Sequence, residues 1–330
     1  MKITRKDVAA AAGVSQSTVS FVINGRMDIA IPESTRQRVL AVVKELGYTP
    51  NKAARALVTG HSNIIVLSIP SIGSPYFANL IELMHAQLLR DGYDMVIGPY
   101  RPEEKHKRLI WDLNGLVADG AIMWGMPADP EMLHKMTESL NIPLVVINVL
   151  PSDGFDSVFI DLYSAAREAV GDLLKSGRNR TVLLTASLMN FEGERRRDAY
   201  MDAVQSAGLE PVIIEIPIIT RTCAREYISD YITSNGCPDA IFCSSDDLAI
   251  GVYHGLRQLG LKIPDDVAIA GCDDLEEVKY FDVPVSSIEQ PVEEMCRIAW
   301  QFLQNRIKDR SLSLQTATLP AKYIRRESSG

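Results

Sequence analysis

The sequence predicts two fold classes in one chain: a small all-α helix-turn-helix headpiece over residues 1–49 and an α/β body with two parallel-sheet subdomains over residues 61–330. Three observations support this division. A chain of 330 residues exceeds the length of one ordinary domain. Two short helical patterns meet at Gly13, and from Asn63 onward apolar strand-like runs alternate with amphipathic helical stretches.

The composition is that of an ordinary globular protein, with 46% hydrophobic and 23% charged residues. The five cysteines are an odd number and lack C-x-x-C spacing, which is typical of reduced core thiols in a cytoplasm. The charged amino end is followed by no apolar segment of the signal-peptide type, and no apolar run approaches the roughly 20 residues of a membrane helix. We therefore expect a cytoplasmic chain without membrane contact.

The charge is distributed unevenly along the chain, whose net charge is −8. Residues 1–60 contain nine Lys or Arg and four acidic residues, a local net charge of +5, whereas the remainder carries −13. A small basic segment on an acidic body is expected where only one end of a protein approaches a polyanion.

The first two helices of the headpiece are predicted from their ends. Thr4 followed by Asp7 resembles a capping box, Gly13 suits the left-handed turn that ends a helix, and Ser15 is a suitable N-cap for the second helix. The apolar faces expected to meet across this turn consist of Val8, Ala9 and Ala12 in the first helix, and of Val19, Val22 and Ile23 in the second. This is the helix-turn-helix pattern.

A third helix should begin near Pro32 and run to about Leu46, and Gly47 should end it. Its apolar stripe is expected at Val39, Leu40, Val43 and Leu46. Residues 50–60 then form a hinge or linker, in which the helical segment 52–57 is too short to be stable alone in water. A segment of this kind could become helical only on DNA.

The body is expected to contain eight strands, which could form one large sheet or two. The predicted strands are Ile64–Ile69, Met95–Gly98, Gly120–Trp124, Leu144–Asn148, Val182–Thr185, Val212–Ile216, Ala240–Cys243 and Val267–Gly271. The predicted helices are Phe77–Arg90, Leu162–Lys175, Arg195–Ala207, Leu248–Leu259 and Val292–Gln304. One set of strand-helix units changes to the next between Asp161 and Leu162.

The sequence contains no recognisable catalytic constellation. The first strand leads into 71–77, which lacks G-x-G-x-x-G, and there is no Walker loop. The acid pairs at 246–247, 265–266 and 273–274 could be metal ligands, but no His lies near them, so turn and helix-cap roles are favoured. The five histidines are scattered. We therefore expect no enzyme activity, no cofactor and no metal.

The headpiece motifs, taken in order and with their spacing, resemble those of the LacI/GalR family of bacterial regulators. These motifs are Asp7-Val8-Ala9, Gly13-Val14-Ser15, Ser17-Thr18-Val19-Ser20, Asn24-Gly25, Thr35-Arg36, Leu46 to Asn51 and Ala54-Arg55-Ala56-Leu57. The body is similar to the same family at Ser74 to Phe77, Ser244 to Gly251, Gly271 to Asp274, Ser286 to Pro291 and Leu319 to Ser328. The resemblance implies a periplasmic-binding-protein-like body, in which two subdomains are joined by three crossovers around an effector cleft. It places one subdomain at about 61–160 with 291–318 and the other at about 161–290 with 319–330.

The resemblance also implies two sets of binding residues. The implied DNA-binding residues are Thr4, Ser15, Gln16, Ser17, Thr18, Ser20, Phe21, Asn24, Thr35, Tyr48, Asn51, Ala53, Arg55 and Leu57, with Leu57 as a minor-groove wedge. The implied effector-binding residues are Tyr76, Phe77, Trp124, Asn148, Asp161, Arg196, Arg221, Ser245, Asp273 and Gln290.

Four positions depart from the family pattern. Phe21 stands where a polar base-reading residue is common, which favours contact with a thymine methyl group. Pro32 replaces a serine N-cap that also touches phosphate. Ser245 replaces a common Asn and Asn148 a common Asp, and both changes reduce the polar reach of the effector site.

The expected function is that of a DNA-binding transcriptional repressor, a homodimer on a pseudo-palindromic operator, controlled by a small-molecule effector that is most simply a sugar. A nucleobase, nucleoside, or acidic or phosphorylated effector remains an alternative, as does a sugar-binding protein without regulatory function. The last alternative would require a signal peptide and no basic headpiece, and both features contradict it.

Overall fold

The computed structural model describes residues 3–48, 60–99, 118–125, 141–148, 150, 154–187 and 194–330. The chain divides into two compact units, one up to residue 62 and one from residue 63 onward. We call them the headpiece and the body and describe each by itself.

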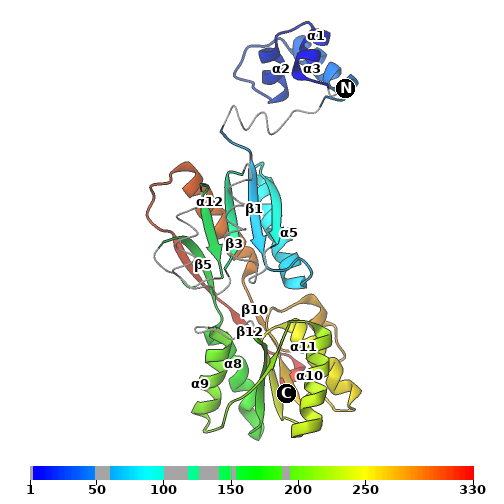
Figure 1. Ribbon diagram of the computed structural model, residues 1–330, viewed down its shortest axis with the longest axis vertical. Helices are drawn as coiled ribbons and strands as arrows, with labels where there is room; N and C mark the ends of the chain where they lie inside the picture. Colours follow the sequence, from blue (N-terminus) through cyan, green and yellow to red (C-terminus); the bar gives the residue numbers. More distant parts are fainter. Residues whose placement is uncertain are drawn as a thin grey trace. The chain divides into compact units, whose positions relative to one another are not determined.

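The headpiece consists of three helices around a small apolar core (Figure 1). They are α1 (Arg5–Ala12), α2 (Gln16–Ile23) and α3 (Glu33–Glu45). Gly13 adopts a left-handed φ of 63° at the end of α1 and allows α2 to follow at once. The buried side chains are Val8, Ala9 and Ala12 of α1, Val19 and Val22 of α2, and Val39 of α3.

The predicted stripe of α3 is wrong at one position. Leu40 is 47% exposed, whereas Val42 packs against the core beside Val43 and Leu46. The side chain of Val39 points into the centre of the three helices, so that its neighbour Leu40 is turned toward solvent. Pro32 is the N-cap of α3 and supplies no side-chain cap, as expected for a residue without a hydroxyl group.

The first lobe of the body is a six-stranded parallel sheet with two helices on one face (Figure 1). In spatial order the strands are β11 (Thr316–Pro320), β5 (Asp156–Asp161), β4 (Leu144–Ile147), β3 (Gly120–Trp124), β1 (Ile64–Ile69) and β2 (Asp94–Pro99). The helices α5 (Pro75–Arg90) and α12 (Val292–Lys308) pack on each other and on these strands. The central strands β1, β3 and β4 are almost wholly apolar and buried, as expected inside a parallel sheet, whereas the edge strand β11 is largely exposed.

The second lobe is a four-stranded parallel sheet covered by helices on both faces (Figure 1). Its strands, in spatial order, are β7 (Val212–Ile216), β6 (Thr181–Ala186), β8 (Ala240–Cys243) and β9 (Ala268–Ala270). The helix pairs are α8 (Tyr163–Leu174) with α9 (Arg195–Ser206), and α10 (Arg221–Asn235) with α11 (Asp246–Gln258). Leu183 and Phe242 belong to one core cluster and Val182 and Ile241 to the other, as the alternation of strand side chains requires.

Three connections link the two lobes. The chain passes from β5 to α8 at residues 161–163, returns from β10 (Ser287–Glu289) to α12 at residues 289–292, and passes again from β11 to β12 (Lys322–Ile324). The strands β10 and β12 pair antiparallel with each other. Among the described residues, the second lobe also contains three short 3-10 helices, η1 (Lys175–Gly177), η3 (Glu276–Lys279) and η4 (Glu327–Ser329).

The structure resolves the choice between one sheet and two in favour of two large sheets with an additional two-stranded pair. The eight predicted strands are all present, although four of them end one residue or so away from the predicted positions. Helix α10 and strands β5, β10, β11 and β12 were not predicted. Within the described parts of the chain, no helix is both long and apolar enough to cross a membrane.

Candidate functional site

The N-terminal ends of α1 and α2 are held by the caps that the sequence predicts. The backbone N–H and the hydroxyl of Thr4 both donate to the Asp7 carboxylate, at 2.8 and 2.7 Å. The hydrogen bonds to Thr4 are the main reason that the pKa of Asp7 is lowered. Ser15 Oγ accepts from the backbone N–H of Thr18 at 3.1 Å. Both helices of the motif therefore begin at positions set by local bonds.

The predicted base-reading face of α2 is polar and accessible. Gln16 and Ser17 are exposed, while Phe21 is half-buried one turn later. The hydroxyls of Ser15, Ser17 and Thr18 lie together, with Ser15 Oγ 2.7 Å from Ser17 Oγ and 2.9 Å from Thr18 Oγ1. Hydroxyl groups at the N-terminal end of a helix can donate to phosphates or base edges without moving the backbone.

The other predicted DNA contacts lie around this face or outside the described residues. Thr4 and Asn24 are exposed, and Asn24 Nδ2 donates to Ser20 Oγ at 3.3 Å. Ser20, Thr35 and Tyr48 are half-buried, and Tyr48 packs against the headpiece core. Asn51, Ala53, Arg55 and Leu57, together with the predicted hinge helix, fall among residues that the structure does not describe.

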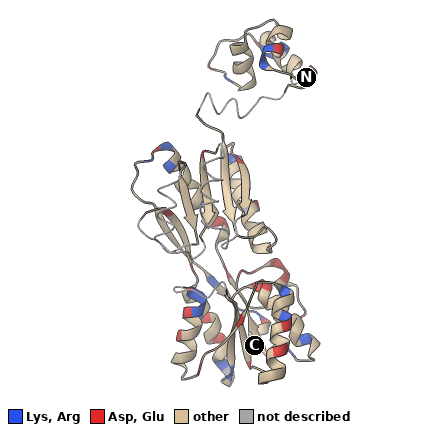
Figure 2. Ribbon diagram, in the orientation of Figure 1, with Lys and Arg blue, Asp and Glu red and all other residues tan. Residues whose placement is uncertain are grey.

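Two arginines of the basic headpiece have structural partners that the sequence did not indicate. The Arg36 guanidinium is buried and donates to the carbonyls of Arg26 and Ile29, at 2.7 and 3.0 Å, which fixes the loop before α3. Arg38 Nε donates to the carbonyl of Ala12 at 3.0 Å. Charges of both signs lie on the headpiece helices (Figure 2), and these two guanidinium groups already donate hydrogen bonds within the headpiece.

In the body, three of the predicted effector residues form an aromatic trio, Tyr76, Phe77 and Trp124. Their rings meet edge to face in all three pairs, with centroid distances between 5.1 and 5.5 Å. Tyr76 and Phe77 belong to the first turn of α5, and Trp124 is the last residue of β3. The trio therefore lies at the carboxyl end of a parallel strand, where α/β proteins commonly bind ligands.

Tyr76 also joins a chain of hydrogen bonds that links the first lobe to the second. Its hydroxyl donates to Gln290 Oε1 at 3.2 Å, and Gln290 Nε2 donates to Asp273 Oδ1 at 2.7 Å. Burial raises the pKa of the Tyr76 hydroxyl well above its ordinary value, and the Asp273 carboxylate raises it further. Burial likewise raises the pKa of Asp273 well above its usual range, with a further contribution from Asp246. We call Tyr76, Asp273 and Gln290 the polar bridge.

Arg196 lies beside the polar bridge but is already paired. It is 8% exposed; its Nε donates to Glu194 Oε1 at 2.6 Å and its Nη1 to the carbonyl of Ser244 at 2.7 Å. Burial acts to lower the pKa of the guanidinium, and Glu194 with neighbouring acidic groups outweighs it, so that the pKa is raised. Sequence reasoning missed Glu194, which also caps α9 through the N–H of Arg197 at 2.8 Å.

Arg221, at the start of α10, is paired with two carboxylates. Its Nε donates to Asp247 Oδ1 and its Nη2 to Glu277 Oε1, each at 2.8 Å. Ser74, which precedes α5 in the first lobe, donates to the other Asp247 oxygen at 3.3 Å. This contact is a second polar link between the lobes, and neither Asp247 nor Ser74 was predicted to be in the site.

The remaining three predicted effector residues, Asp161, Ser245 and Asn148, make polar contacts outside the polar bridge. Asp161 Oδ1 accepts from the N–H of Tyr163 at 3.0 Å and lies 3.6 Å from Arg195 Nε. Ser245 is the N-cap of α11 and accepts from the N–H of Leu248 at 3.4 Å. Asn148 follows β4 with a left-handed φ of 64° and donates its N–H to the carbonyl of Val158 at 2.8 Å.

Asp246 has a buried carboxyl group whose charge acts on Asp273 of the polar bridge. Its two oxygens accept from Ser287 Oγ at 2.7 Å and from the N–H of Leu275 at 2.8 Å. Burial raises the pKa of Asp246 to about 7, against the effect of these two hydrogen bonds. Asp266 likewise accepts from the N–H of Lys262 at 2.7 Å. Asp266 therefore has the local turn role that the sequence favoured, whereas Asp246 joins two distant segments instead of capping its own helix, whose N-cap is Ser245.

Several features lie away from the polar bridge. One cavity of about 640 Å³ is lined by Lys279, Pro284, Arg325, Arg326, Glu327 and Gly330. Another, of about 230 Å³, is lined by residues around Pro143, Phe155 and Arg306.

Among the described residues, no three His, Cys, Asp or Glu side chains are placed to hold a metal ion. All five cysteines are free thiols, three of them buried and two half-buried.

Comparison with known proteins assigns families to both parts of the chain. Residues 4–51 match the model of the bacterial regulatory proteins of the lacI family, and residues 170–329 match that of a periplasmic binding protein-like domain. The chain is 30% identical over 331 residues to the ribose operon repressor of Haemophilus influenzae, covering 98% of each chain. It is 28% identical to the transcriptional repressor PurR of Yersinia pestis, covering 98% of this chain and 96% of that one.

Solved structures show the same fold. The lac repressor dimer bound to operator and an anti-inducer superimposes with a TM-score of 0.88 at 20% identity, covering 100% of this chain and 99% of that one. A complex of the transcriptional regulator CelR with cellobiose gives a TM-score of 0.72 at 26% identity, covering 99% and 100%. With an ordered set of headpiece motifs and a relative 30% identical over nearly its whole length, this chain belongs to the LacI family of bacterial regulatory proteins.

Proposed function

We propose that this LacI-family regulator is a cytoplasmic repressor that binds operator DNA as a homodimer and responds to a small neutral sugar bound between the two lobes of the body. The polar bridge carries the proposal. It joins Tyr76 of the first lobe, through Gln290 in the connection between β10 and α12, to Asp273 of the second lobe. A ligand that engages these groups would therefore change the angle between the lobes.

In this proposal each part of the chain has its own role. The headpiece (1–49) would read the operator, and the hinge (50–60) would transmit the state of the body. The effector would bind between subdomains at 61–160 with 291–318 and at 161–290 with 319–330. A change in lobe angle would alter the spacing of two hinges in a dimer, which amounts to a coupling free energy between two sites. No reaction is assigned, because the polar bridge holds no nucleophile aligned with a general base.

The ion pairs of the site favour a neutral effector over an acidic or phosphorylated one. Arg196 is paired with Glu194 at 2.6 Å, Arg221 with Asp247 at 2.8 Å, and Arg195 lies 3.6 Å from Asp161. An anion would have to displace a carboxylate from each guanidinium. A sugar needs only hydrogen-bond donors and acceptors with an apolar face, and the polar bridge and aromatic trio supply both.

A purine base is the second candidate. The three rings of the aromatic trio could stack on a base, and the chain is similar to PurR over 98% of its length. Amide and carboxyl groups such as those of Gln290 and Asp273 can also pair with the edge of a base.

The effector proposal is tested by thermal unfolding of the full chain with D-ribose, other neutral pentoses and hexoses, purine bases and ribose 5-phosphate. The matched pair is ribose and its 5-phosphate, which differ only in the charged group. A ligand present at 100 times its Kd should raise the free energy of unfolding by about 2.7 kcal/mol. A neutral sugar should do so and its phosphate should not; stabilisation by the phosphate alone would contradict the proposal.

The DNA-binding proposal is tested with a duplex selected by the protein from a random-sequence pool. Affinity for this duplex should fall by roughly 10³- to 10⁵-fold between 50 and 200 mM salt if about six to ten phosphates are contacted. Gln16→Ala should weaken binding to the selected duplex more than to a scrambled one of the same length. Equal affinity of the wild-type protein for both duplexes would exclude sequence-specific recognition.

A further inference from the structure

The turn that carries Asp273 is backbone-strained. Asp273 and Asp274 follow β9 with positive φ angles of 120° and 49°, which non-glycine residues adopt at a cost. In this conformation the Asp273 carboxylate accepts from Gln290 Nε2 at 2.7 Å. A strained turn persists only if its surroundings hold it in place.

One side of the turn is held by backbone amides. Asp273 donates its N–H to the carbonyl of Ile288 at 2.9 Å. Asp274 donates its N–H to Ser287 Oγ at 3.1 Å, and the same hydroxyl donates to Asp246 at 2.7 Å. These bonds attach the turn to β10, but they leave the Asp274 carboxylate to be fixed by another group.

That group is Arg326, in the segment after β12. Its Nη2 lies 2.6 Å from Asp274 Oδ1, and the two side chains are 17% and 9% exposed. Lys279 lies farther from the other oxygen, at 3.3 Å. A guanidinium and a carboxylate at this distance, largely removed from water, form an ion pair that solvent screens less than a pair on the surface.

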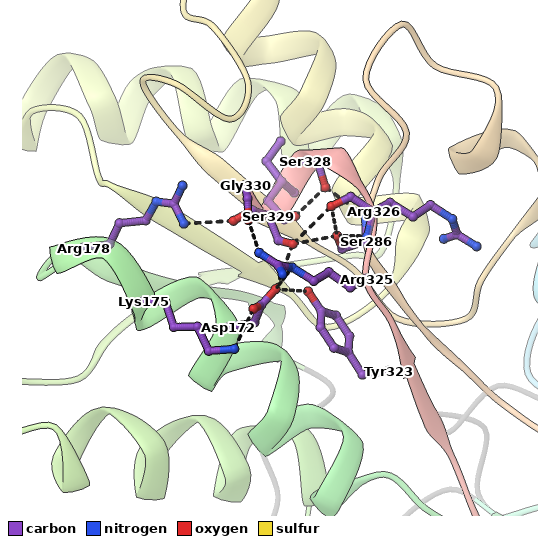
Figure 3. Close-up of polar contacts among 11 residues, drawn as sticks. Asp172, Lys175, Arg178, Ser286, Tyr323, Arg325, Arg326, Ser328, Ser329 and Gly330 are labelled. Carbon is purple, nitrogen blue, oxygen red and sulfur yellow. Dashed lines mark hydrogen bonds and ion pairs between the residues drawn. The ribbon is translucent and has the colours of Figure 1, made fainter.

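Arg326 is itself held by a buried serine cluster (Figure 3). Its backbone N–H donates to Ser286 Oγ at 2.8 Å, and its Nη1 donates to the carbonyl of Val285 at 2.9 Å. Ser328 Oγ accepts from the N–H of Ser286 at 2.8 Å and donates to the carbonyl of Ile269 at 2.7 Å. The guanidinium therefore projects from a segment anchored to β9 and to the strand entering β10.

We propose that Arg326 is a positioning residue for the effector site: by holding Asp274 it keeps the 273–274 turn in its strained form and so directs Asp273 toward Gln290 and Tyr76. This inference rests on the proposed function in one respect, that Asp273 contacts the effector. Arg326 itself touches none of the polar bridge. It acts through Asp274, from the outer side of the second lobe.

The neighbouring Arg325 provides a matched control (Figure 3). It also pairs with a buried acid, Asp172 of α8, which its Nε approaches to 3.0 Å and which is 3% exposed. Asp172 also accepts from Tyr323 and Ser329, at 3.1 and 2.9 Å. Arg325 and Arg326 are therefore adjacent arginines on one segment, each paired with a buried carboxylate, and of the two only Arg326 pairs directly with the 273–274 turn. Asp172 reaches the serine cluster only through Ser329, whose Oγ lies 2.9 Å from Ser286 Oγ.

The test that needs no ligand is amide hydrogen exchange in the full chain. Arg326→Met should speed exchange of the amides in 271–279 by roughly tenfold or more, because the turn loses a partly buried ion pair and the Asp274 carboxylate loses its guanidinium partner. Arg325→Met should leave those amides within about twofold of wild type and instead affect the amides around Asp172. Arg326→Lys should give an intermediate rate. Asp274→Asn breaks the same pair from the other side and should match Arg326→Met.

Unchanged exchange in 271–279 for both Arg326→Met and Asp274→Asn would overturn the inference, as would an equal effect of Arg325→Met there. Calorimetric titration with D-ribose adds the functional readout: Kd should rise roughly tenfold for Arg326→Met, less for Arg326→Lys, and not for Arg325→Met. If ribose binds none of the forms, wild type included, the proposed effector is wrong, and the exchange rates still decide the role of Arg326.

Discussion

The headpiece and the body differ in how far along the chain their polar side chains find partners. In the headpiece, the caps of α1 and α2 each join residues three apart, Thr4 with Asp7 and Ser15 with Thr18. In the body, Tyr76 and Gln290 are 214 residues apart, and Ser74 and Asp247 are 173 apart. The start of each helix of the helix-turn-helix is thus set by bonds within that helix, whereas the polar bridge between the lobes forms only once both lobes have folded.

A consequence is that substitutions should act in separate regions. Each unit has its own apolar core, centred on Val8, Val19 and Val39 in the headpiece and on the two sheets in the body. A destabilising change in one core should leave hydrogen exchange in the other unchanged. The following predictions test this separation, from the largest expected effect to the smallest.

Asp246→Asn should change how the stability of the body depends on pH. The pKa of Asp246 is about 7 in the folded protein and near 3.8 in the unfolded chain, so the folded state binds the proton more tightly. The free energy of unfolding should therefore fall as pH rises from about 4 to about 7, by on the order of 1 to 4 kcal/mol, and level off above.

The asparagine variant cannot titrate at this position and should lack that component, so the wild-type free energy of unfolding should decline relative to the variant across this range. The charges facing Asp246 are Asp273, Asp274 and Arg326. Denaturant unfolding at pH 4.5 and 7.5 measures the difference, and identical pH slopes for the two proteins would contradict it. Exchange in 5–45 should be the same in both.

Gly251→Ala should destabilise the second lobe by about 1 to 3 kcal/mol. A Cβ at this position would lie 2.3 Å from the carbonyl oxygen of Arg221 and 2.8 Å from Ala224 Cβ, so α10 and α11 would have to separate. The matched control is Gly171→Ala in α8, where a Cβ would meet nothing within 4 Å and should stabilise the helix by roughly 0.5 to 1 kcal/mol. Denaturant unfolding of the two variants should give effects of opposite sign.

Ser15→Ala should destabilise the headpiece by about 1 kcal/mol, because α2 loses the acceptor for the N–H of Thr18. The control is Ser34→Ala, an exposed serine in the first turn of α3. Hydrogen exchange should rise in 16–23 for Ser15→Ala only, and the body amides should exchange as in wild type. A comparable rise in the body would show that the two units are not independent.

Where a segment's structure depends on its own residues, the sequence was sufficient to predict it. Gly13 with the flanking Asp7 and Ser15 predicted α1 and α2, and the apolar runs at β1, β3, β7 and β8 predicted these strands to the residue. Strands that lie inside a parallel sheet, such as β1, β3 and β8, must be largely apolar, and a helix end must satisfy its free N–H groups. Both requirements are therefore visible in the local sequence.

The segments that were not predicted depend on distant partners. β5 begins with Asp156, a buried carboxylate whose oxygens accept from Arg306 at 2.7 and 2.9 Å and from the backbone N–H of Gln315 at 2.9 Å. α10 has a weak apolar face, and its position depends on close packing against Gly251 and Gly255 of α11. Neither Arg306 nor the two glycines can be connected with these segments from the sequence alone.

For the effector site, the motifs placed ten residues together on the basis of resemblance, and the structure divides them. Tyr76, Phe77, Trp124, Asp273 and Gln290 contact one another in the aromatic trio and polar bridge. Arg196 and Arg221 are engaged by Glu194 and Asp247, and Ser245 caps a helix. Residue type shows what a side chain can bind, but not whether a neighbour already occupies it.

By itself, the sequence determined the family, the helix-turn-helix, the alternation of strands and helices, and the basic character of the first 60 residues. These properties follow from periodicity, caps and charge, all of which act over a few residues. Only the tertiary structure decided that two sheets form rather than one, that three site arginines face carboxylates, and that Arg326 holds the turn of Asp273. Each depends on groups brought together from far apart in the chain, because the energy of a polar group is set by its neighbours in space.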